Sequence, residues 1–327
     1  RAGFELTIID STFAGHIREL AHQLDYTGYD GFIVIGGDGS MHEMVNGMLS
    51  RSDQKQMPIG LIPGGTGNSF LHDLNLLNPI NAAEAIVNGF TRPIDVMEIS
   101  INQIKRYAFN IVGWGLVTDV GKHAERYRWM GERRYTFTSV LEVLNLKPRP
   151  AQLVFGDNKI IDDFTMIIAC NTCHTGKGMK MAPKSKLDDG LVDLVIIRYG
   201  ATRLKLLTTL PKIFDGSHIY DPIVEYHQVK EFSLTPKVDE TLNIDGELLG
   251  STPIHVKVIQ QKITVYAREK EFWTDEKGGQ WLFKPVAKRD EFVAHGEESA
   301  YRIGRLIDPD AVEVRTIRLN GRMGSIQ

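Results

Sequence analysis

The sequence of 327 residues predicts two domains of different class: an α/β domain, followed by a mostly antiparallel β domain. Two apolar runs, at 32–35 and 59–62, each end in a glycine-rich turn that leads into a helical pattern, as in an open parallel sheet. After Pro93 the apolar residues fall into short runs separated by turn residues, which is typical of antiparallel strands. We therefore expect an α/β domain at residues 1–92, a β domain at residues 93–268 and an extension of unassigned role at residues 269–327.

Composition and charge exclude several classes of protein. The apolar fraction of 42% suits a globular protein with a real core, and the net charge of −3 gives no positive field to hold a nucleic acid. No apolar run approaches the roughly 20 residues of a membrane-spanning helix, and the first residues show no signal-peptide pattern. Two cysteines argue against a disulfide scaffold and fit a reducing compartment, so a cytoplasmic location is expected.

The first domain is expected to contain the following elements in order. A strand is predicted at 4–9 and a helix at 16–24, where the apolar residues share one face. The two strand–turn–helix units come next, and the methionines of the first helix are expected in the core rather than at a lipid-contacting face. A last helix is predicted at 81–89, with Asn81 as its N-cap and Gly89 as its end.

The second domain is predicted to be a sandwich of short strands interrupted by two helical stretches. One helical stretch runs from 118 to 129 and continues through 135–144, and the other runs from 203 to 214. The strands are expected at 94–99, 107–112, 152–155, 164–169, 191–197, 232–234, 254–258 and 263–267.

The two glycine-rich turns, residues 36–39 and 63–68, have the composition of a phosphate site. Glycine leaves room for a ligand to approach the backbone, and the N–H groups at the start of the next helix attract anions. Asp38 is the one acid in the first turn, and it suits a Mg²⁺ partner or a base that takes a proton from an attacking hydroxyl. Thr66 and Asn68 can donate hydrogen bonds to phosphate or sugar. The alternative is a pair of purely structural turns.

The two motifs at this spacing, GGDGSMHEMVNGML and PGGTGNSF, resemble the catalytic domain shared by diacylglycerol, ceramide, sphingosine and bacterial lipid kinases. The resemblance covers about residues 5–268. It implies a Rossmann-like nucleotide-binding domain followed by a β-sandwich, with the lipid site between them. GGDG alone also resembles NAD kinases, so an NAD kinase-type enzyme is a distant alternative. The first strand of the family, with its Asn-Pro turn, has no counterpart here and is expected to be missing.

The resemblance implies ATP as the phosphate donor and Mg²⁺ as its companion ion. The residues expected to bind the nucleotide are Gly36, Gly37, Gly39, Glu43, Gly64, Gly65, Thr66, Gly67, Asn68, Arg128, Arg134, Asp245 and Gly246. Of these, Arg128 and Arg134 match the arginines that contact ATP phosphates in sphingosine kinases, and forked guanidiniums suit phosphate oxygens.

The acidic turn at 243–247 supplies a second candidate for the catalytic base. An Asp-Gly turn suits a simple hairpin, but two acids flanking a glycine can also hold a metal or orient a hydroxyl. In the bacterial branch of the family the glutamate that matches Glu247 is regarded as the base. In the sphingosine and ceramide kinase branch the GGDG aspartate, here Asp38, has that role. Both residues therefore stay candidates.

The stretch after Gly115 resembles the sphingosine and ceramide kinase branch. Sphingosine kinases have Asp-Val-Asp here, and the second Asp holds the amino group of the lipid. This chain has Asp119-Val120-Gly121, so Asp119 is the remaining candidate for substrate binding. A sphingoid base is the first expectation, with ceramide or diacylglycerol as alternatives.

Two further motifs have competing interpretations. In bacterial relatives, a loop that matches residues 184–193 holds a structural Mg²⁺, which would place the ion at Lys186, Asp189 and Leu191; a solvated turn fits equally well. The run Cys170–His174 reads C-x-x-C-H, the haem attachment pattern. A buried-type strand precedes it and no export signal is seen, so a strand end is the better interpretation.

The sequence thus predicts an ATP- and Mg²⁺-dependent lipid kinase that phosphorylates a primary hydroxyl at a membrane surface and associates with it peripherally. The alternative of another class is a non-catalytic lipid- or nucleotide-binding pseudokinase.

Overall fold

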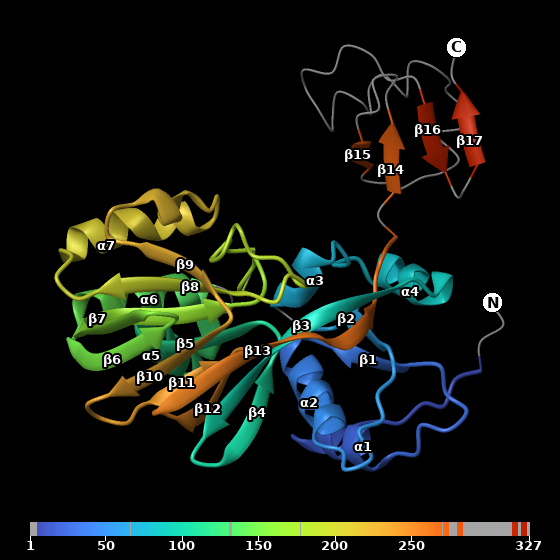
Figure 1. Ribbon diagram of the computed structural model, residues 1–327, viewed down its shortest axis with the longest axis horizontal. Helices are drawn as coiled ribbons and strands as arrows, with labels where there is room; N and C mark the ends of the chain where they lie inside the picture. Colours follow the sequence, from blue (N-terminus) through green and yellow to red (C-terminus); the bar gives the residue numbers. More distant parts are fainter. Residues whose placement is uncertain are drawn as a thin grey trace. The chain divides into compact units, whose positions relative to one another are not determined.

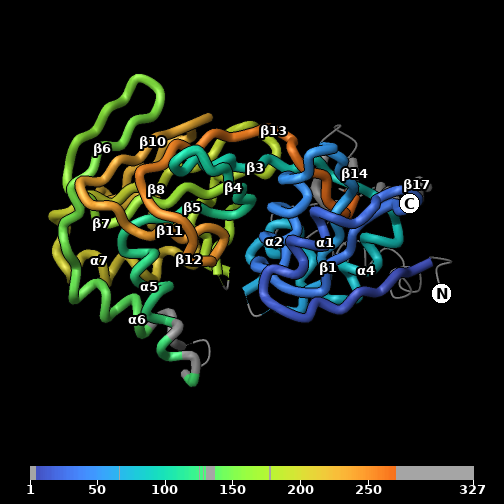
Figure 2. The backbone as a smooth tube through the Cα atoms, turned by 90° about the horizontal axis from the view of Figure 1, so that it is seen from below, coloured from blue at the N-terminus to red at the C-terminus, as the bar shows by residue number. Residues whose placement is uncertain are grey.

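The computed structural model describes residues 5–65, 67–130, 133–176 and 178–269, together with four short strands beyond them. The chain divides into two compact units, Arg1–Ala267 and Arg268–Gln327, which are treated separately. Figures 1 and 2 show the first unit from two directions.

The two predicted strand–turn–helix units are confirmed. Strand β1 (Phe32–Gly36) pairs in parallel with β2 (Ile59–Pro63), with Phe32 opposite Ile59. Helix α2 (Asp38–Leu49) follows the first turn and α3 (Ser69–Asp73) the second; α1 (His16–Gln23) packs near α2 (Figure 1). The methionines of α2 are fully buried, as core residues should be.

Two predictions in this part are wrong. Residues 5–9 form no strand: Leu6 and Ile8 are exposed, and among the described strands β1 pairs with β2 alone. The helix expected at 81–89 is α4 (Pro79–Asn88), which begins earlier because the Asn78 side chain accepts hydrogen bonds from the amides of the first turn. Gly89 ends the helix with a left-handed backbone, as expected.

Strands β3 (Thr91–Ile101) and β13 (Ile254–Tyr266) join the two parts of the unit. They pair antiparallel along nearly their whole length, and Val265 of β13 pairs in parallel with Ile59 of β2. One sheet of 13 strands therefore runs through the part of the unit that is described (Figure 1). The boundary predicted at residue 92 falls at the start of β3, within this sheet.

The remaining strands of the sheet pair antiparallel, as the predicted β domain requires. They are β4 (Ile104–Ala108), β5 (Ile111–Gly115), β6 (Arg149–Phe155), β7 (Asn158–Cys170), β8 (Val192–Arg198), β9 (Glu225–Val229), β10 (Glu231–Pro236), β11 (Thr241–Ile244) and β12 (Glu247–Ser251).

The prediction contained no strand corresponding to β9, β11 or β12, and β7 begins at Asn158 rather than at 164. Two further boundaries also differ from the prediction. The run at 107–112 is interrupted at Phe109-Asn110 and gives two strands, β4 and β5, because a carboxylate binds the amides there, as described below. The two strands expected at 254–258 and 263–267 are one strand, β13, with an irregularity between Ile259 and Ile263.

Alternate residues of the central strands supply two apolar cores. On β7, Ile167 and Ala169 face one core with Trp114, whereas Met166 and Ile168 face the other. Helices α5 (Leu116–Ala124), α6 (Arg133–Leu144) and α7 (Arg203–Thr209) pack against the second core (Figure 2), as does the 3₁₀ segment η2 (Leu210–Ile213). The 3₁₀ segments η1 (Glu125–Met130) and η3 (Ser217–Tyr220) follow α5 and η2 along the chain.

The described strands of the second unit form two hairpins. Strand β14 (Glu271–Thr274) pairs with β15 (Gln280–Phe283), and β16 (Thr316–Leu319) pairs with β17 (Arg322–Ser325).

Candidate active site

The two glycine turns interlock. The Gly64 amide donates a hydrogen bond of 2.8 Å to the Gly36 carbonyl oxygen, which continues the β1–β2 ladder into the turns. A Cβ built on Gly65 would lie 2.7 Å from the Cα of Gly37, closer than real Cβ atoms come to backbone. Glycine is therefore required at 65 because the two backbones touch, before any ligand is considered.

The N-terminus of α2 lies at this junction, and the first amides of the helix have no hydrogen-bond acceptor within it. Gly37 is the N-cap residue and supplies no side-chain hydrogen bond to the first turn. The amides of Asp38, Gly39 and Ser40 precede the first helical hydrogen bond, which Met41 donates to Gly37. Three N–H groups with a helix dipole behind them make a seat for an anion, and phosphate is the common occupant.

Asp38 ties the first turn to the helix after the second. Its Oδ2 accepts a hydrogen bond from the Ser69 amide at 2.7 Å, and its Oδ1 accepts one from the Phe70 amide at 3.2 Å. Burial raises the pKa of the Asp38 carboxyl, an effect that the two amide hydrogen bonds oppose. Each carboxylate oxygen keeps a lone pair for a further partner.

Glu247 is the exposed carboxylate at the same place. Its Oε1 lies 3.0 Å from the position that a Cβ on Gly39 would take, so the carboxylate stands beside the first turn of α2. Among the described residues it has no hydrogen-bond or ion-pair partner, and its side chain is open to solvent. A free, exposed carboxylate beside an anion seat is suited to accept a proton.

Asp245, two residues before Glu247, is buried and saturated with hydrogen bonds. Its Oδ1 accepts from the amides of Asn110 at 2.8 Å and Ile111 at 3.0 Å. Its Oδ2 accepts from the Phe109 amide at 3.3 Å and lies 2.8 Å from His42 Nδ1. The carboxylate thus fixes the break between β4 and β5 and attaches α2 to it, and a positive φ of 54° turns the chain toward Glu247.

Asn46, one turn after His42 on α2, makes a second link to the same strands. Its Nδ2 donates to the Tyr107 carbonyl at 2.8 Å, and its Oδ1 accepts from the Tyr107 amide at 3.0 Å. His42 and Asn46 were not identified from the sequence; their separation by four residues, which puts both on one helix face, was the available signal. These two side chains position the anion seat against the turn that carries Glu247.

Two family models match the chain in succession. The diacylglycerol kinase catalytic domain matches residues 1–99, and the YegS C-terminal NAD kinase beta sandwich-like domain matches residues 110–267. The chain belongs to the diacylglycerol kinase family of lipid kinases. It is therefore a phosphotransferase, and its family implies ATP as the phosphate donor.

The relatives of this kinase include enzymes named for different lipids. It is 27% identical over 341 residues to sphingosine kinase 1 of Arabidopsis thaliana; the matched region covers 87% of this chain and 69% of that protein. It is 26% identical over 257 residues to diacylglycerol kinase of Bacillus subtilis (strain 168), which covers 77% of this chain and 82% of that one. A crystal structure of a diacylglycerol kinase from Bacillus anthracis superposes with a TM-score of 0.62 at 20% identity, over 79% of this chain and 84% of that chain, which supports the fold.

Some residues expected to bind the nucleotide make other contacts, and some lie outside the described residues. Glu43 Oε1 accepts a hydrogen bond of 2.9 Å from the Gly15 amide, at the start of α1. Thr66 lies outside the described residues, as do the side chains of Arg128 in η1 and Arg134 in α6.

Asn68, Gly67 and Gly246 are at the turns, as expected. Asn68 Nδ2 donates to the Gly65 carbonyl at 2.9 Å, and its buried Oδ1 has no partner among the described residues. A Cβ on Gly67 would make an ordinary contact of 3.6 Å with Asp38 Oδ2. The Gly246 amide donates to Asn243 Oδ1 at 2.9 Å, which closes the turn before Glu247.

Asp119 of the kinase is committed to an ion pair. Its carboxylate contacts the Arg149 guanidinium, which also donates to Glu240 Oε2 at 3.0 Å. Gly121, two residues after Asp119 on α5, lies near the turn that precedes Glu247: a Cβ there would be 3.3 Å from Asn243 Nδ2.

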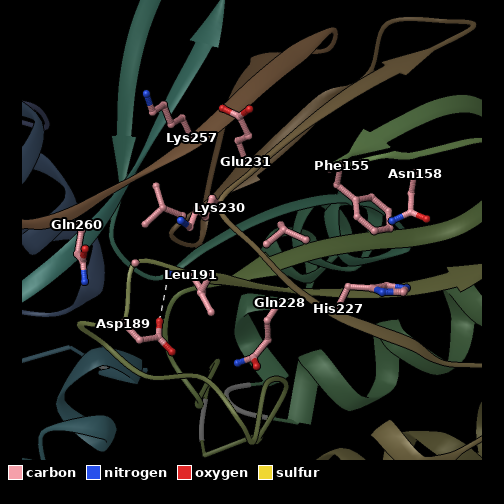
Figure 3. Close-up of a pocket in the computed structure, with 14 residues that line it drawn as sticks. Phe155, Asn158, Asp189, Leu191, His227, Gln228, Lys230, Glu231, Lys257 and Gln260 are labelled. Carbon is pink, nitrogen blue, oxygen red and sulfur yellow. Dashed lines mark hydrogen bonds between the residues drawn. The ribbon is translucent and has the colours of Figure 1, made fainter.

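The loop expected to hold a structural Mg²⁺ borders a pocket of about 860 Å³ (Figure 3). Asp189 and Leu191 line this pocket, and Asp189 Oδ1 accepts a hydrogen bond of 3.1 Å from the Leu191 amide. The pocket is not lined by Lys186. Buried Asp95 organises the loop, since its Oδ2 accepts from the Gly190 amide at 2.6 Å.

Proposed function

We propose that this lipid kinase transfers the γ-phosphoryl group of ATP to a primary hydroxyl of a membrane-derived lipid, with a sphingoid base as the first candidate substrate. The observation that carries the proposal is the anion seat at the start of α2, with Glu247 free and exposed beside it. Phosphoryl transfer needs mainly positioning and charge neutralisation around the phosphates, and a group to receive the proton of the attacking hydroxyl.

The roles divide among the residues as follows. The turns at Gly37–Gly39 and Gly64–Asn68 hold the nucleotide phosphates with backbone N–H groups. Glu247 receives the hydroxyl proton, because it is exposed and lacks any other partner among the described residues. Arg128 and Arg134 neutralise phosphate charge through their guanidinium groups. Asp245 and Gly246 act by holding Glu247 in place.

Asp38 is the residue that fits the Mg²⁺ that accompanies ATP. Hard divalent cations prefer carboxylate oxygens near substrate phosphates, and both Asp38 oxygens keep a lone pair after accepting one amide each. When bound, the ion would neutralise charge on the phosphates. With Asp38 committed to two amides and the ion, Glu247 is the better proton acceptor of the two.

A neutral lipid is the second candidate substrate, and α5 supplies the observation that favours it. An ammonium group needs a carboxylate, yet Asp119 is paired with Arg149, and Gly121 has no side chain. Ceramide or diacylglycerol requires no such partner. The sphingoid base keeps first place because sphingosine kinase 1 of Arabidopsis thaliana matches 87% of the chain.

Contact with a membrane surface follows from a lipid substrate. No helix among the described residues is long and apolar enough to cross a bilayer. We propose that the kinase associates peripherally with a membrane from the cytoplasmic side.

A separate proposal concerns the loop of Lys186, Asp189 and Leu191, which we expect to hold a structural Mg²⁺.

The test is transfer of labelled phosphate from ATP to a panel of sphingosine, ceramide, diacylglycerol and monoacylglycerol, separated by chromatography. Label on sphingosine supports the first candidate. Label on ceramide or diacylglycerol in its place overturns the sphingoid choice and supports the neutral lipid.

Two rivals are tested by adding NAD to the panel and by measuring ATP binding with calorimetry. Nucleotide binding in calorimetry with no label on any lipid would indicate a non-catalytic binding protein and contradict the proposed function. Label on NAD, with none on the lipids, would indicate an NAD kinase-type activity.

A further inference from the structure

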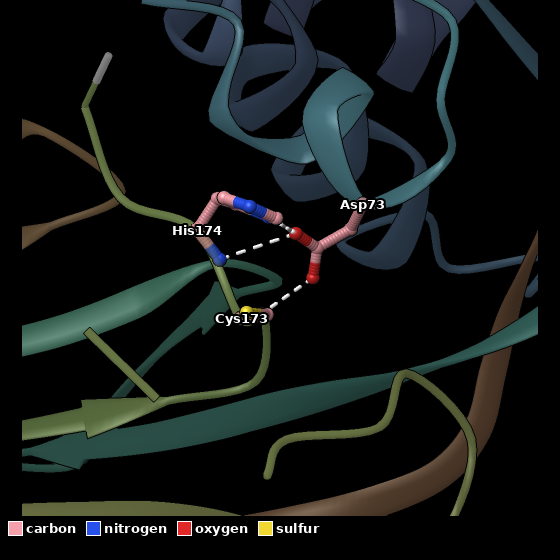
Figure 4. Close-up of side chains that lie close together, drawn as sticks. All are labelled: Asp73, Cys173 and His174. Carbon is pink, nitrogen blue, oxygen red and sulfur yellow. Dashed lines mark hydrogen bonds and ion pairs between the residues drawn. The ribbon is translucent and has the colours of Figure 1, made fainter. Parts of the chain in front are cut away.

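Asp73, Cys173 and His174 lie together where the end of α3 meets the loop after β7 (Figure 4). One side-chain donor atom of each lies within 4.8 Å of the other two. The carboxylate comes from a position 100 residues before the cysteine, so only the fold assembles the group. It is separate from the residues assigned to phosphoryl transfer above.

Asp73 organises the group and retains capacity for another partner. Its Oδ2 accepts from the Cys173 amide at 2.6 Å, and its Oδ1 accepts from the His174 amide at 3.1 Å and from His174 Nδ1 at 2.5 Å. A carboxylate offers about four lone-pair sites, so three hydrogen bonds leave one free. The backbone bonds hold the carboxylate in place whatever happens to the imidazole.

The three donors match the preferences of one class of ion. A thiolate sulfur, an imidazole nitrogen and a carboxylate oxygen are the usual protein ligands of Zn²⁺, whereas Mg²⁺ and Ca²⁺ prefer oxygen alone. The His174 and Asp73 side chains are 21% and 8% exposed, so solvent reaches the group from one side. Water can therefore occupy the fourth position of a tetrahedral ion.

We propose that Asp73, Cys173 and His174 bind a thiophilic divalent cation, Zn²⁺, through Sγ, Nδ1 and a carboxylate oxygen. On binding, the Cys173 thiol gives its proton to solvent, and the imidazole moves its proton from Nδ1 to Nε2. The ion takes the place of the hydrogen between Nδ1 and Oδ1. Bonds of about 2.0–2.1 Å at a tetrahedral ion separate a nitrogen and an oxygen ligand by roughly 3.3 Å, so the His174 imidazole and the Asp73 carboxylate move apart by less than about 1 Å.

An ion here would link two segments that also serve the nucleotide site. The first amides of α3 bind Asp38, and Asp73 is the last residue of that helix. The Ser69 hydroxyl of α3 donates to the Gly176 carbonyl at 3.2 Å, in the same loop as His174. The cation would fix the far end of a helix whose near end holds Asp38.

The test uses Co²⁺ as a spectroscopic stand-in for Zn²⁺ on the purified full chain under reducing conditions. The expected result is binding of one equivalent of Co²⁺, with a thiolate-to-cobalt charge-transfer absorption that one equivalent of Zn²⁺ abolishes and excess Mg²⁺ does not. Absence of stoichiometric binding, or a spectrum without the thiolate absorption, would overturn the site.

A matched pair of cysteine variants assigns the sulfur. Cys173→Ala is expected to lose the charge-transfer absorption, whereas Cys170→Ala keeps it, because Cys170 is fully buried in the core behind the loop. The opposite pattern would contradict the assignment. Asp73→Asn risks unfolding the loop, so His174→Ala serves as the second ligand variant; it is expected to weaken Co²⁺ binding at least about tenfold. Unchanged affinity in His174→Ala would also overturn the proposal.

Discussion

Asp38 and Glu247 differ in their surroundings, and this difference separates their chemistry. Asp38 is half-buried and accepts hydrogen bonds from the amides of Ser69 and Phe70, whereas Glu247 is exposed beside Gly39. A group that moves protons needs freedom to rotate and access to its substrate, whereas a group that orders two turns needs fixed partners. This supports Glu247 as the base and Asp38 as the organiser of the seat.

Asp38→Asn is expected to reduce phosphoryl transfer at least about a hundredfold while the protein stays folded. The variant replaces one acceptor oxygen by an amide that cannot accept from the backbone, at a cost of about 1–3 kcal/mol, but it also removes a half-buried charge. The two effects on the free energy of unfolding oppose each other, so a net change under about 2 kcal/mol is expected in urea unfolding. Full activity would contradict the role of Asp38 in the seat.

Asp193 makes stability depend on pH. Burial raises the pKa of its carboxyl to about 6, although the hydrogen bond that the Tyr226 hydroxyl donates to the carboxylate acts to lower this pKa. The folded state therefore favours the protonated acid: this stabilisation is complete below about pH 4 and is lost as the pH rises through about 6.

Asp193→Asn cannot titrate, so its stability relative to the wild-type protein is expected to rise between pH 4 and 6. The limit is about 3 kcal/mol, because a pKa shift from 3.8 to about 6 is worth about 1.4 kcal/mol per unit. Urea unfolding of both proteins at several pH values measures this difference. A difference that stays constant with pH would disprove the assignment.

At the scale of elements, the interlocked turns separate two effects of glycine. Gly65→Ala is expected to push the turns apart, lowering the free energy of unfolding by about 1–3 kcal/mol and weakening ATP binding at least tenfold. Gly67→Ala should leave stability nearly unchanged, since among the described residues its Cβ would make just one contact, of 3.6 Å, with Asp38 Oδ2. Calorimetry with ATP and thermal unfolding compare the two. Equal stability of both variants would contradict the interlock.

The link between α2 and the β strands depends on Asp245. Asp245→Asn leaves buried amides or His42 without an acceptor, so a loss of about 3 kcal/mol in the free energy of unfolding is expected. Exposed Asp10→Asn serves as the control and should have little effect. A small change in Asp245→Asn would show that the strands hold without it.

Elements with strong local signals could be predicted, and elements that depend on partners could not. The turns after 32–35 and 59–62 carry their signal in glycine, so they were placed correctly. Residues 5–9 have the alternation of a strand but no pairing partner among the described strands. The break at Phe109-Asn110 requires a carboxylate about 135 residues away, which no local pattern reveals.

The same limit applies to the site in the whole molecule. Asp38 and the glycines were identified because they are contiguous and resemble a family motif. The saturation of Asp245 and the pairing of Asp119 with Arg149 depend on contacts distant in sequence. The C-x-x-C-H pattern likewise gives no sign of Asp73, because this residue lies 100 residues before Cys173.

At the scale of the whole molecule, one continuous sheet places Glu247 beside α2. Strands β3 and β13 connect the parallel strands to the antiparallel ones, and β11 and β12 bring the turn of residues 245 and 246 against α2. Asp38 and Glu247 thus come from the two parts of the chain that the two family models match.

The most direct test of this account compares phosphoryl transfer by the wild-type chain and Glu247→Gln, with Glu231→Gln as an exposed control on β10. Initial rates are measured with labelled ATP and the best lipid of the panel, and ATP affinity is measured by calorimetry. We expect Glu247→Gln to lose about a hundredfold or more in rate while ATP affinity and stability stay near those of the wild type. A Glu247→Gln enzyme that transfers phosphate at the wild-type rate would contradict the assignment of Glu247 as the base.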